Sequence, residues 1–140
     1  MHLNAKLLVA IFSLGAALLI GISFATAQKP GPQESISLKS GETAELGNVF
    51  WVVNCRSLLT GPPVAEVLEG PLEVTATVRV QNVIPRKMNC ANEVSGGMLL
   101  VTAPKEIKQR TQGILTIRLK YPTKDGERQA SRQLNVTLFP

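Results

Sequence analysis

Apolar and polar residues alternate along most of the chain after residue 34, and this period of two predicts β-strands instead of helices. Residues 72–80 give the clearest pattern, in which every second residue is apolar. The apolar residues of this face are Leu72, Val74, Ala76, Val78 and Val80. Residues 115–121 and 134–138 repeat the alternation. In each of these strands one face is expected to pack in a core and the other to meet water.

Two shorter patterns lie nearer the start of the chain. Residues 35–39 and 43–46 alternate on either side of the turn signal Ser40-Gly41, which predicts a hairpin. Residues 49–54 form a compact apolar run, which is typical of a central strand buried on both faces.

Further strands are expected at residues 64–68 and 98–103, the second entered through Gly96-Gly97. Asp125-Gly126 predicts a tight hairpin between the last two strands, because glycine accepts the positive φ that such turns need. In all, seven or eight short strands spaced about 8–12 residues apart predict an all-β protein, an antiparallel β-sandwich over residues 35–140. A small closed barrel is the alternative.

The first 27 residues differ from the rest. A basic start ends at Lys6, an apolar run covers residues 7–24, and Ala25-Thr26-Ala27 follows. This layout predicts a signal-peptide helix over residues 1–27 that is removed on export, so the protein is expected to be periplasmic or secreted. The alternative is an uncleaved anchor, because the apolar run is long enough to span a bilayer. Only an uncleaved anchor would bring the chain into contact with a membrane through residues 1–27.

Residues 28–34 are rich in proline, glycine and glutamine, and they are expected to form a flexible leader. The sandwich domain would therefore begin at residue 35.

The chain has two cysteines, Cys55 and Cys90. An oxidising compartment and an even count predict one structural disulfide between them. Because Cys55 ends a predicted strand and Cys90 lies in the long connection that follows residue 80, the bridge would pin a long loop to the edge of a sheet.

Histidine is the residue whose absence matters most. The single histidine of the chain is His2, inside the predicted signal peptide. Catalysis by Ser-His-Asp or Cys-His needs an imidazole base, and histidine metal sites need an imidazole ligand. The sequence therefore predicts a protein that is not an enzyme and has neither a metal nor a cofactor. The remaining catalytic alternative is a carboxylate pair, either Glu66 with Glu69 or Glu42 with Glu45.

The formal net charge of +5 is concentrated near the C-terminus, where residues 104–140 hold eight basic and three acidic residues. The candidate basic face consists of Arg118, Lys120, Lys124 and Arg128. Such a face could meet an anionic envelope surface, or it could keep an exposed sheet soluble. Nucleic acid is not expected as a partner, because few aromatic residues are nearby to stack on bases.

The loops joined by the predicted disulfide are the other candidate surface. The candidate binding residues are Arg56, Leu58 and Leu59 on one side and Arg86, Lys87, Met88, Asn89 and Asn92 on the other. Long loops held by a rigid scaffold commonly carry binding sites, and arginine beside exposed apolar residues suits a protein interface. The alternative is that these apolar residues cap the open end of the sandwich.

The order of strands resembles the immunoglobulin-like sandwiches of small exported bacterial proteins. Trp51 precedes Cys55 here, whereas immunoglobulin domains carry their tryptophan between the two cysteines. The resemblance implies a seven- to eight-stranded sandwich and assigns no functional residue.

A second resemblance is to the chagasin-like inhibitors of cysteine proteases. It is carried by residues 40–43, by Gly96-Gly97 and by residues 113–121. The asparagine-proline-threonine-threonine-glycine loop of that family is absent, because residues 54–57 read Asn-Cys-Arg-Ser.

The function expected from the sequence is an exported, non-enzymatic module that binds another protein. The alternative is an inhibitor of a secreted or periplasmic hydrolase of the cysteine-protease or lysozyme type.

Overall fold

The computed structural model describes residue 31 and residues 34–140 of the chain. The predicted signal peptide at residues 1–27 and nearly all of the predicted leader therefore lie outside the described residues. The strands are β1 (Ser35–Lys39), β2 (Thr43–Val49), β3 (Val52–Val53), β4 (Arg56–Ser57), β5 (Val64–Glu69), β6 (Thr75–Val83), β7 (Val94–Thr102), β8 (Thr111–Thr123) and β9 (Gly126–Phe139). A single 3-10 turn, η1 (Arg86–Met88), lies between β6 and β7. The prediction of an all-β protein is confirmed.

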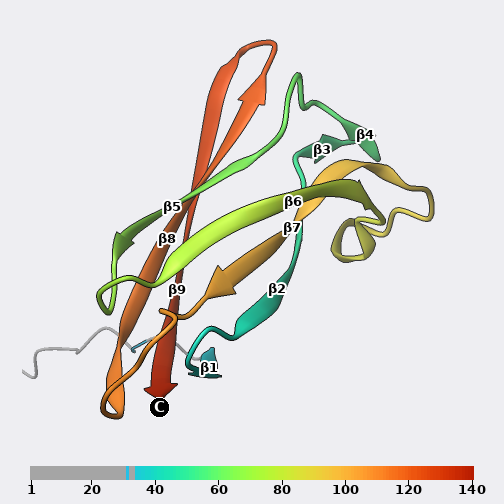
Figure 1. Ribbon diagram of the computed structural model, residues 1–140. Coiled ribbons are helices and arrows are strands. Elements are labelled where there is room, and N and C mark those ends of the chain that lie inside the picture. Colours follow the sequence, from blue (N-terminus) through green and yellow to red (C-terminus); the bar gives the residue numbers. More distant parts are fainter. Residues whose placement is uncertain (1–30, 32–33) are drawn as a thin grey trace, which may run out of the picture.

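The strands form three sheets (Figure 1). One sheet has the order β1-β9-β8-β5, the second has the order β2-β7-β6, and β3 pairs with β4 alone. Neighbouring strands are antiparallel except β1 and β9, which run parallel. The long β8–β9 hairpin projects beyond the other strands at its tip (Figure 1).

The core lies between the two larger sheets. β7 contributes Leu99 and Val101, β8 contributes Leu115 and Ile117, and β9 contributes Leu134, all fully buried. Burial of each such side chain contributes about 1.5–3 kcal/mol of folding free energy. The alternation predicted for residues 115–121 and 134–138 is confirmed.

The hairpin predicted over residues 35–46 is wrong. β1 pairs with β9 and β2 pairs with β7, so the chain crosses from one sheet to the other between them. The turn is held from both sides, because the Ser40 N–H donates to the Phe139 carbonyl and the Gly41 N–H donates to the Pro104 carbonyl. Alternation shows which face of a strand is buried, whereas the neighbour of the strand depends on contacts across the whole chain.

Two strand boundaries also differ from the prediction. Leu72 is 89% exposed and lies in a turn closed by the Val74 N–H and the Pro71 carbonyl, so β6 begins only after it. The run at residues 49–54 is not one central strand: β2 ends in it, and the two-residue β3 begins a hairpin whose Val53 is 53% exposed. The tight hairpin predicted at Asp125-Gly126 is confirmed, with Gly126 at φ +109°.

Candidate functional site

A disulfide joins Cys55 to Cys90, with their Cα atoms 5.4 Å apart, and this prediction is confirmed. Cys55 lies in the turn between β3 and β4, and Cys90 follows η1. The bridge therefore ties the β3–β4 hairpin to the β6–β7 connection. A hydrogen bond from the Ser57 hydroxyl to the Ser95 carbonyl, at 3.2 Å, adds a second link between the hairpin and β7.

The two halves of the predicted binding loops line different hollows, although the disulfide connects them. Leu59 lies in a hollow bordered by residues 60–63 and by Val80. Arg86 and Lys87 line another hollow, which includes neither Leu58 nor Leu59. The remaining predicted residues of these loops, all exposed, are Arg56, Met88, Asn89 and Asn92. The disulfide therefore joins the two loops, but their described residues do not line a common pocket.

The second hollow, which we call the edge hollow, has a volume of about 380 Å³. Its lining residues come from β2 and the residue after it, from the β6–β7 connection and from the core side of the β8–β9 hairpin. They are Leu46, Gly47, Asn48, Val49, Phe50, Ile84, Arg86, Lys87, Tyr121 and Arg132. Successive side chains of a strand point to opposite faces, so the four consecutive β2 residues 46–49 line one hollow because the edge of the strand borders it. β2 is the last strand of its sheet, which leaves that edge without a neighbouring strand in the described chain.

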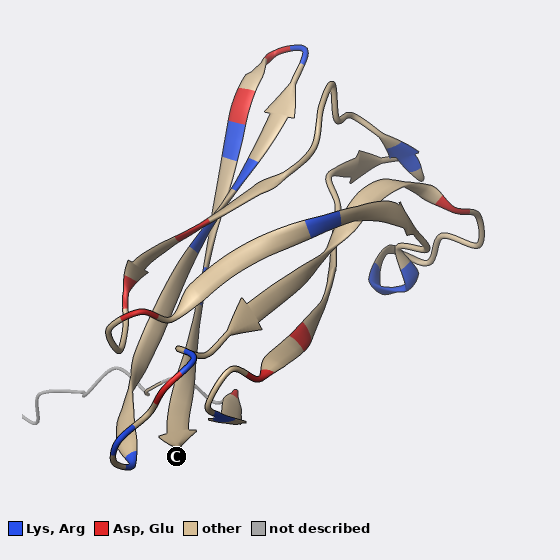
Figure 2. Cartoon of the chain, viewed as in Figure 1, with Lys and Arg blue, Asp and Glu red and all other residues tan. Residues whose placement is uncertain are grey.

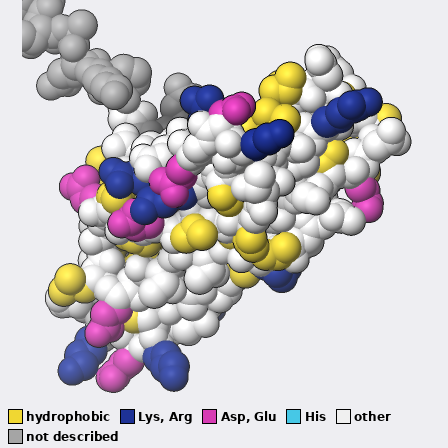
Figure 3. All heavy atoms as spheres, turned by 90° about the horizontal axis from the view of Figure 1, so that it is seen from above, with side chains coloured by type: hydrophobic (Ala, Val, Ile, Leu, Met, Phe, Trp, Pro, Cys, Tyr) yellow, Lys and Arg dark blue, Asp and Glu magenta, His cyan; other side chains and the backbone are white. Residues whose placement is uncertain are grey.

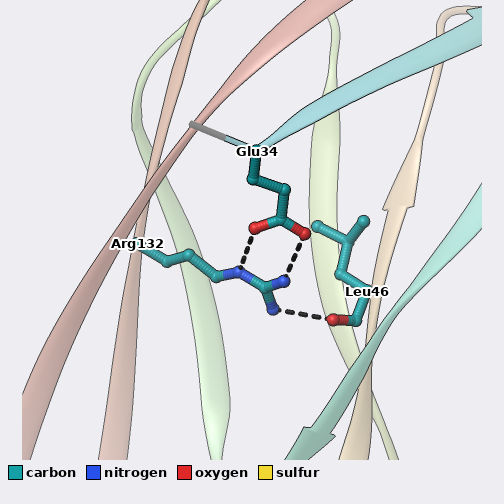
Figure 4. Close-up of polar contacts among 3 residues, drawn as sticks. All are labelled: Glu34, Leu46 and Arg132. Carbon is teal, nitrogen blue, oxygen red and sulfur yellow. Dashed lines mark hydrogen bonds and ion pairs between the residues drawn. The ribbon is translucent and has the colours of Figure 1, made fainter. Parts of the chain in front are cut away.

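Arg132 and Leu46, which both line the edge hollow, belong to a clasp of hydrogen bonds made by Arg132 (Figure 4). Its Nε and Nη2 atoms donate to the two carboxylate oxygens of Glu34 at 2.9 and 2.5 Å, and its Nη1 donates to the Leu46 carbonyl at 2.8 Å. The β2–β7 register shifts between Glu45 and Gly47, so Leu46 sits in a bulge that leaves its carbonyl available to the guanidinium. The clasp therefore connects the start of β1, the bulge of β2 and β9.

Two aromatic residues line the hollow, Phe50 and Tyr121, and Tyr121 is the single tyrosine of the chain. Tyr121 is buried, and burial raises the pKa of its phenol above the ordinary value of 10.0, an effect that the nearby Arg132 charge partly offsets. Its ring lies 5.2 Å from the ring of Trp51, centre to centre. Trp51 is half-buried and packs against the core. Trp51, the only tryptophan of the chain, therefore contacts a residue that lines the hollow.

The electrostatics of the edge hollow are one-sided. Three of its lining residues are cationic and none is acidic. Glu34 balances Arg132, whereas no ion pair joins Arg86 or Lys87 to another side chain among residues 34–140. Figure 2 shows the basic residues of the η1 loop apart from those of the β8–β9 hairpin. The hollow therefore has a positive rim that the described chain does not neutralise.

The four residues of the predicted basic face do not share one face. Arg118 and Lys120 lie on the outer side of β8, where both reach the Glu66 carboxylate of β5, at 3.9 and 3.2 Å. Arg128 is directly opposite Tyr121, and residues opposite each other in an antiparallel pair point to the same side. Arg128 therefore projects toward the core side, and Lys124 lies in the turn at the tip of the hairpin.

Three of the four carboxylates considered for catalysis have structural partners. Glu66 is paired as described, Glu45 forms an ion pair of 2.7 Å with Arg79, and Glu42 accepts the backbone N–H of Lys39 at 2.7 Å. Over the described residues no group of three or more histidine, cysteine, aspartate or glutamate side chains is placed to hold a metal ion. Nor does any helix in that part of the chain have the length and apolar character needed to cross a membrane.

Exposed apolar side chains are scattered between charged ones on the face seen from above (Figure 3). The large exposed ones in the described chain include Leu58, Leu68, Leu72, Val80 and Met88.

No protein-family model, curated protein or solved structure matches this chain. The site is therefore argued from its own geometry.

Most residues of the edge hollow have no signal in the sequence. Arg86 and Lys87 were expected as binding residues, but Glu34 and Arg132 are 98 positions apart, and neither belongs to a recognisable motif. Tyr121 reads as an ordinary core residue because it continues the alternation of its strand. Only the strand pairing brings these residues together.

Proposed function

We propose that this chain is an exported, non-enzymatic binding module with an immunoglobulin-like β-sandwich fold. The strand order supports the fold: if β2, β7 and β6 correspond to strands B, E and D, then β5, β8 and β9 correspond to C, F and G, as in immunoglobulin domains. Residues 1–27 would act as the export signal. The disulfide supports export, because such bonds persist in oxidising compartments.

The module binds another protein through the edge hollow and the disulfide-clipped loop that borders it. The observation that carries this proposal is the pair Arg86 and Lys87: two cations without ion-pair partners among residues 34–140, on a loop that Cys90 anchors beside a part-apolar hollow. An arginine next to a part-apolar, part-aromatic surface has the composition of a protein interface. The positive rim would also speed the encounter with an acidic partner.

Affinity capture tests the proposal. The tagged protein is expressed in its own cells, and co-purifying proteins are quantified for the wild type and for the double variant Arg86→Gln/Lys87→Gln. We expect a partner whose recovery falls at least severalfold in the double variant. The matched control, Lys105→Gln/Lys108→Gln, removes the same charge at exposed sites outside the hollow and should leave that recovery unchanged.

Equal loss in the two double variants would mean that binding follows net charge, and the proposal would then be wrong. If the captured protein is a hydrolase, an activity assay with and without the module decides between simple binding and inhibition. Slowing of a cysteine protease or a lysozyme would assign the module as its inhibitor.

A further inference from the structure

We infer that the free edge of β2 at residues 47–49 accepts an extended, carboxylate-bearing segment of the partner protein as an added strand. This inference rests on the proposed function and specifies how the partner is recognised. Main-chain hydrogen bonds along an unpaired edge supply affinity in this mode of recognition, and alternate side chains of the added strand supply specificity.

The backbone of β2 is the first part of the argument. Four consecutive residues of β2, 46–49, border the hollow together with Phe50, which follows the strand, so the hollow runs along the strand edge and not over one of its faces. Unpaired N–H and C=O groups on a strand edge are a template for pairing with another chain. The Leu46 carbonyl shows that groups on this edge are within reach of donors from outside the sheet, because it already accepts a hydrogen bond from Arg132.

The charge and apolar surface of the hollow define the added strand. Arg86 and Lys87 line it without ion-pair partners in the described chain, so carboxylates on the added strand would complement them. Phe50, Ile84 and Tyr121 supply apolar surface in the same hollow. A segment that alternates acidic and apolar residues would place one kind of side chain toward the cations and the other toward this apolar surface.

Charge argues against two other occupants. Pairing with the same β2 edge of a second copy of this chain would bring the same cations against each other, which is unfavourable. The chain's own residues 28–33 contain Lys29 and no carboxylate, so they do not complement the rim. An acidic segment of a different protein is the occupant that the charges favour.

The β5 edge of the larger sheet is less suitable. Prolines at positions 63 and 71 flank this strand. Flanking prolines discourage pairing at an edge. β5 also carries Glu66, already paired with Arg118 and Lys120.

The test uses a synthetic peptide of alternating glutamate and valine and a matched peptide of alternating lysine and valine. Binding to the full-length protein is followed by the fluorescence of Trp51, which contacts the tyrosine of the hollow. We expect the acidic peptide to bind at concentrations up to about 1 mM and the basic peptide to bind at least tenfold more weakly. Arg86→Gln/Lys87→Gln should weaken the binding of the acidic peptide about tenfold, and Lys105→Gln/Lys108→Gln less than threefold.

N-methylation distinguishes an added strand from attraction by charge. Successive N–H groups of a strand point to opposite edges, so methylating every second residue blocks one edge of the peptide only. We expect one of the two methylated series to lose at least tenfold in affinity, and the other to stay within threefold of the parent. Equal behaviour of the two series, or no binding of the acidic peptide, would overturn the inference.

Failure of the inference and failure of the proposed function give different results. If the captured partner still depends on Arg86 and Lys87 while both methylated series bind alike, strand addition is wrong and the binding module stands. If capture does not depend on these two residues, the proposed function itself is wrong.

Discussion

The guanidinium of Arg132 holds the carboxylate of Glu34 through two hydrogen bonds of 2.9 and 2.5 Å, although 98 positions separate the two residues. The same guanidinium reaches the Leu46 carbonyl at 2.8 Å. The residue before β1, the bulge of β2 and β9 are therefore joined by one side chain (Figure 4), and two of the three residues line the edge hollow. The clasp fixes the position of the β2 bulge, and with it the strand edge that we propose as the binding site.

Removing one member of the clasp should destabilise the fold moderately. The Arg132 side chain is 30% exposed and that of Glu34 is 40% exposed, so solvent screens the pair. We expect Glu34→Gln and Arg132→Gln each to lower the free energy of unfolding, with a coupling energy of about 1 kcal/mol between them. Urea unfolding of both single variants and the double variant gives that coupling. If the losses of unfolding free energy in the two single variants are additive in the double variant, Glu34 and Arg132 do not stabilise the fold through each other.

Tyr121 predicts how stability changes at alkaline pH. Burial raises the pKa of its phenol in the folded state above the ordinary value of 10.0, which it has in the unfolded chain. The folded state then holds this proton more tightly, so the contribution to stability is complete below pH 10.0 and is lost as pH rises through the folded pKa.

Two measurements check this prediction. Tyr121 is the only tyrosine, so the ultraviolet absorbance of phenolate follows its ionisation alone. The titration midpoint should lie above 10.0 for the folded protein and should fall on unfolding. Lysines also titrate in this range, so the comparison is with Tyr121→Phe, whose stability should fall less steeply above that pH. Parallel stability curves for the two proteins would refute the prediction.

Gly97 should not tolerate a side chain. A Cβ atom there would lie 2.3 Å from the Val78 side chain and 2.9 Å from the Arg79 carbonyl, since β7 packs closely against β6. We expect Gly97→Ala to cost about 2–3 kcal/mol of stability, because the well-packed neighbours must move. Gly61→Ala is the control: its Cβ atom would meet only the Pro122 ring at 3.5 Å, so its thermal midpoint should stay close to that of the wild type.

The disulfide should contribute substantially to stability. Its cysteines are 35 positions apart, and closing a loop of that size removes conformational entropy from the unfolded chain. We expect Cys55→Ser/Cys90→Ser to lower the free energy of unfolding by about 2–4 kcal/mol in urea. Reductant should have the same effect on the wild type and none on the variant. A variant as stable as the oxidised protein would show that the bridge does not stabilise the fold.

The sequence predicts the strands of the last hairpin well and the site poorly. Leu115, Ile117 and Leu134 are buried as alternation requires, because a strand with one apolar face has one favourable orientation. The turn at Ser40-Gly41 has the same local signal as a hairpin, yet it leads to the other sheet, where hydrogen bonds to Pro104 and Phe139 hold it. Those partners are distant in sequence, so no local pattern contains them.

Gly96-Gly97 illustrates the same limit. The pair was expected to precede a strand as a turn, but both residues lie within β7, where their lack of side chains permits close approach of β2 and β6. The edge hollow depends on similar long-range arrangements, because strand pairing across the whole chain places Arg86, Tyr121 and Arg132 around β2.

Site-specific photocrosslinking in living cells tests the central claim most directly. A photoreactive benzoylphenylalanine replaces Asn48, which lies on β2 in the edge hollow, and in a second protein it replaces Gln112, an exposed polar residue of β8 outside the hollow. The account predicts that the partner recovered by affinity capture is crosslinked from position 48 and not from position 112. Crosslinking from position 112 with none from position 48 would contradict it.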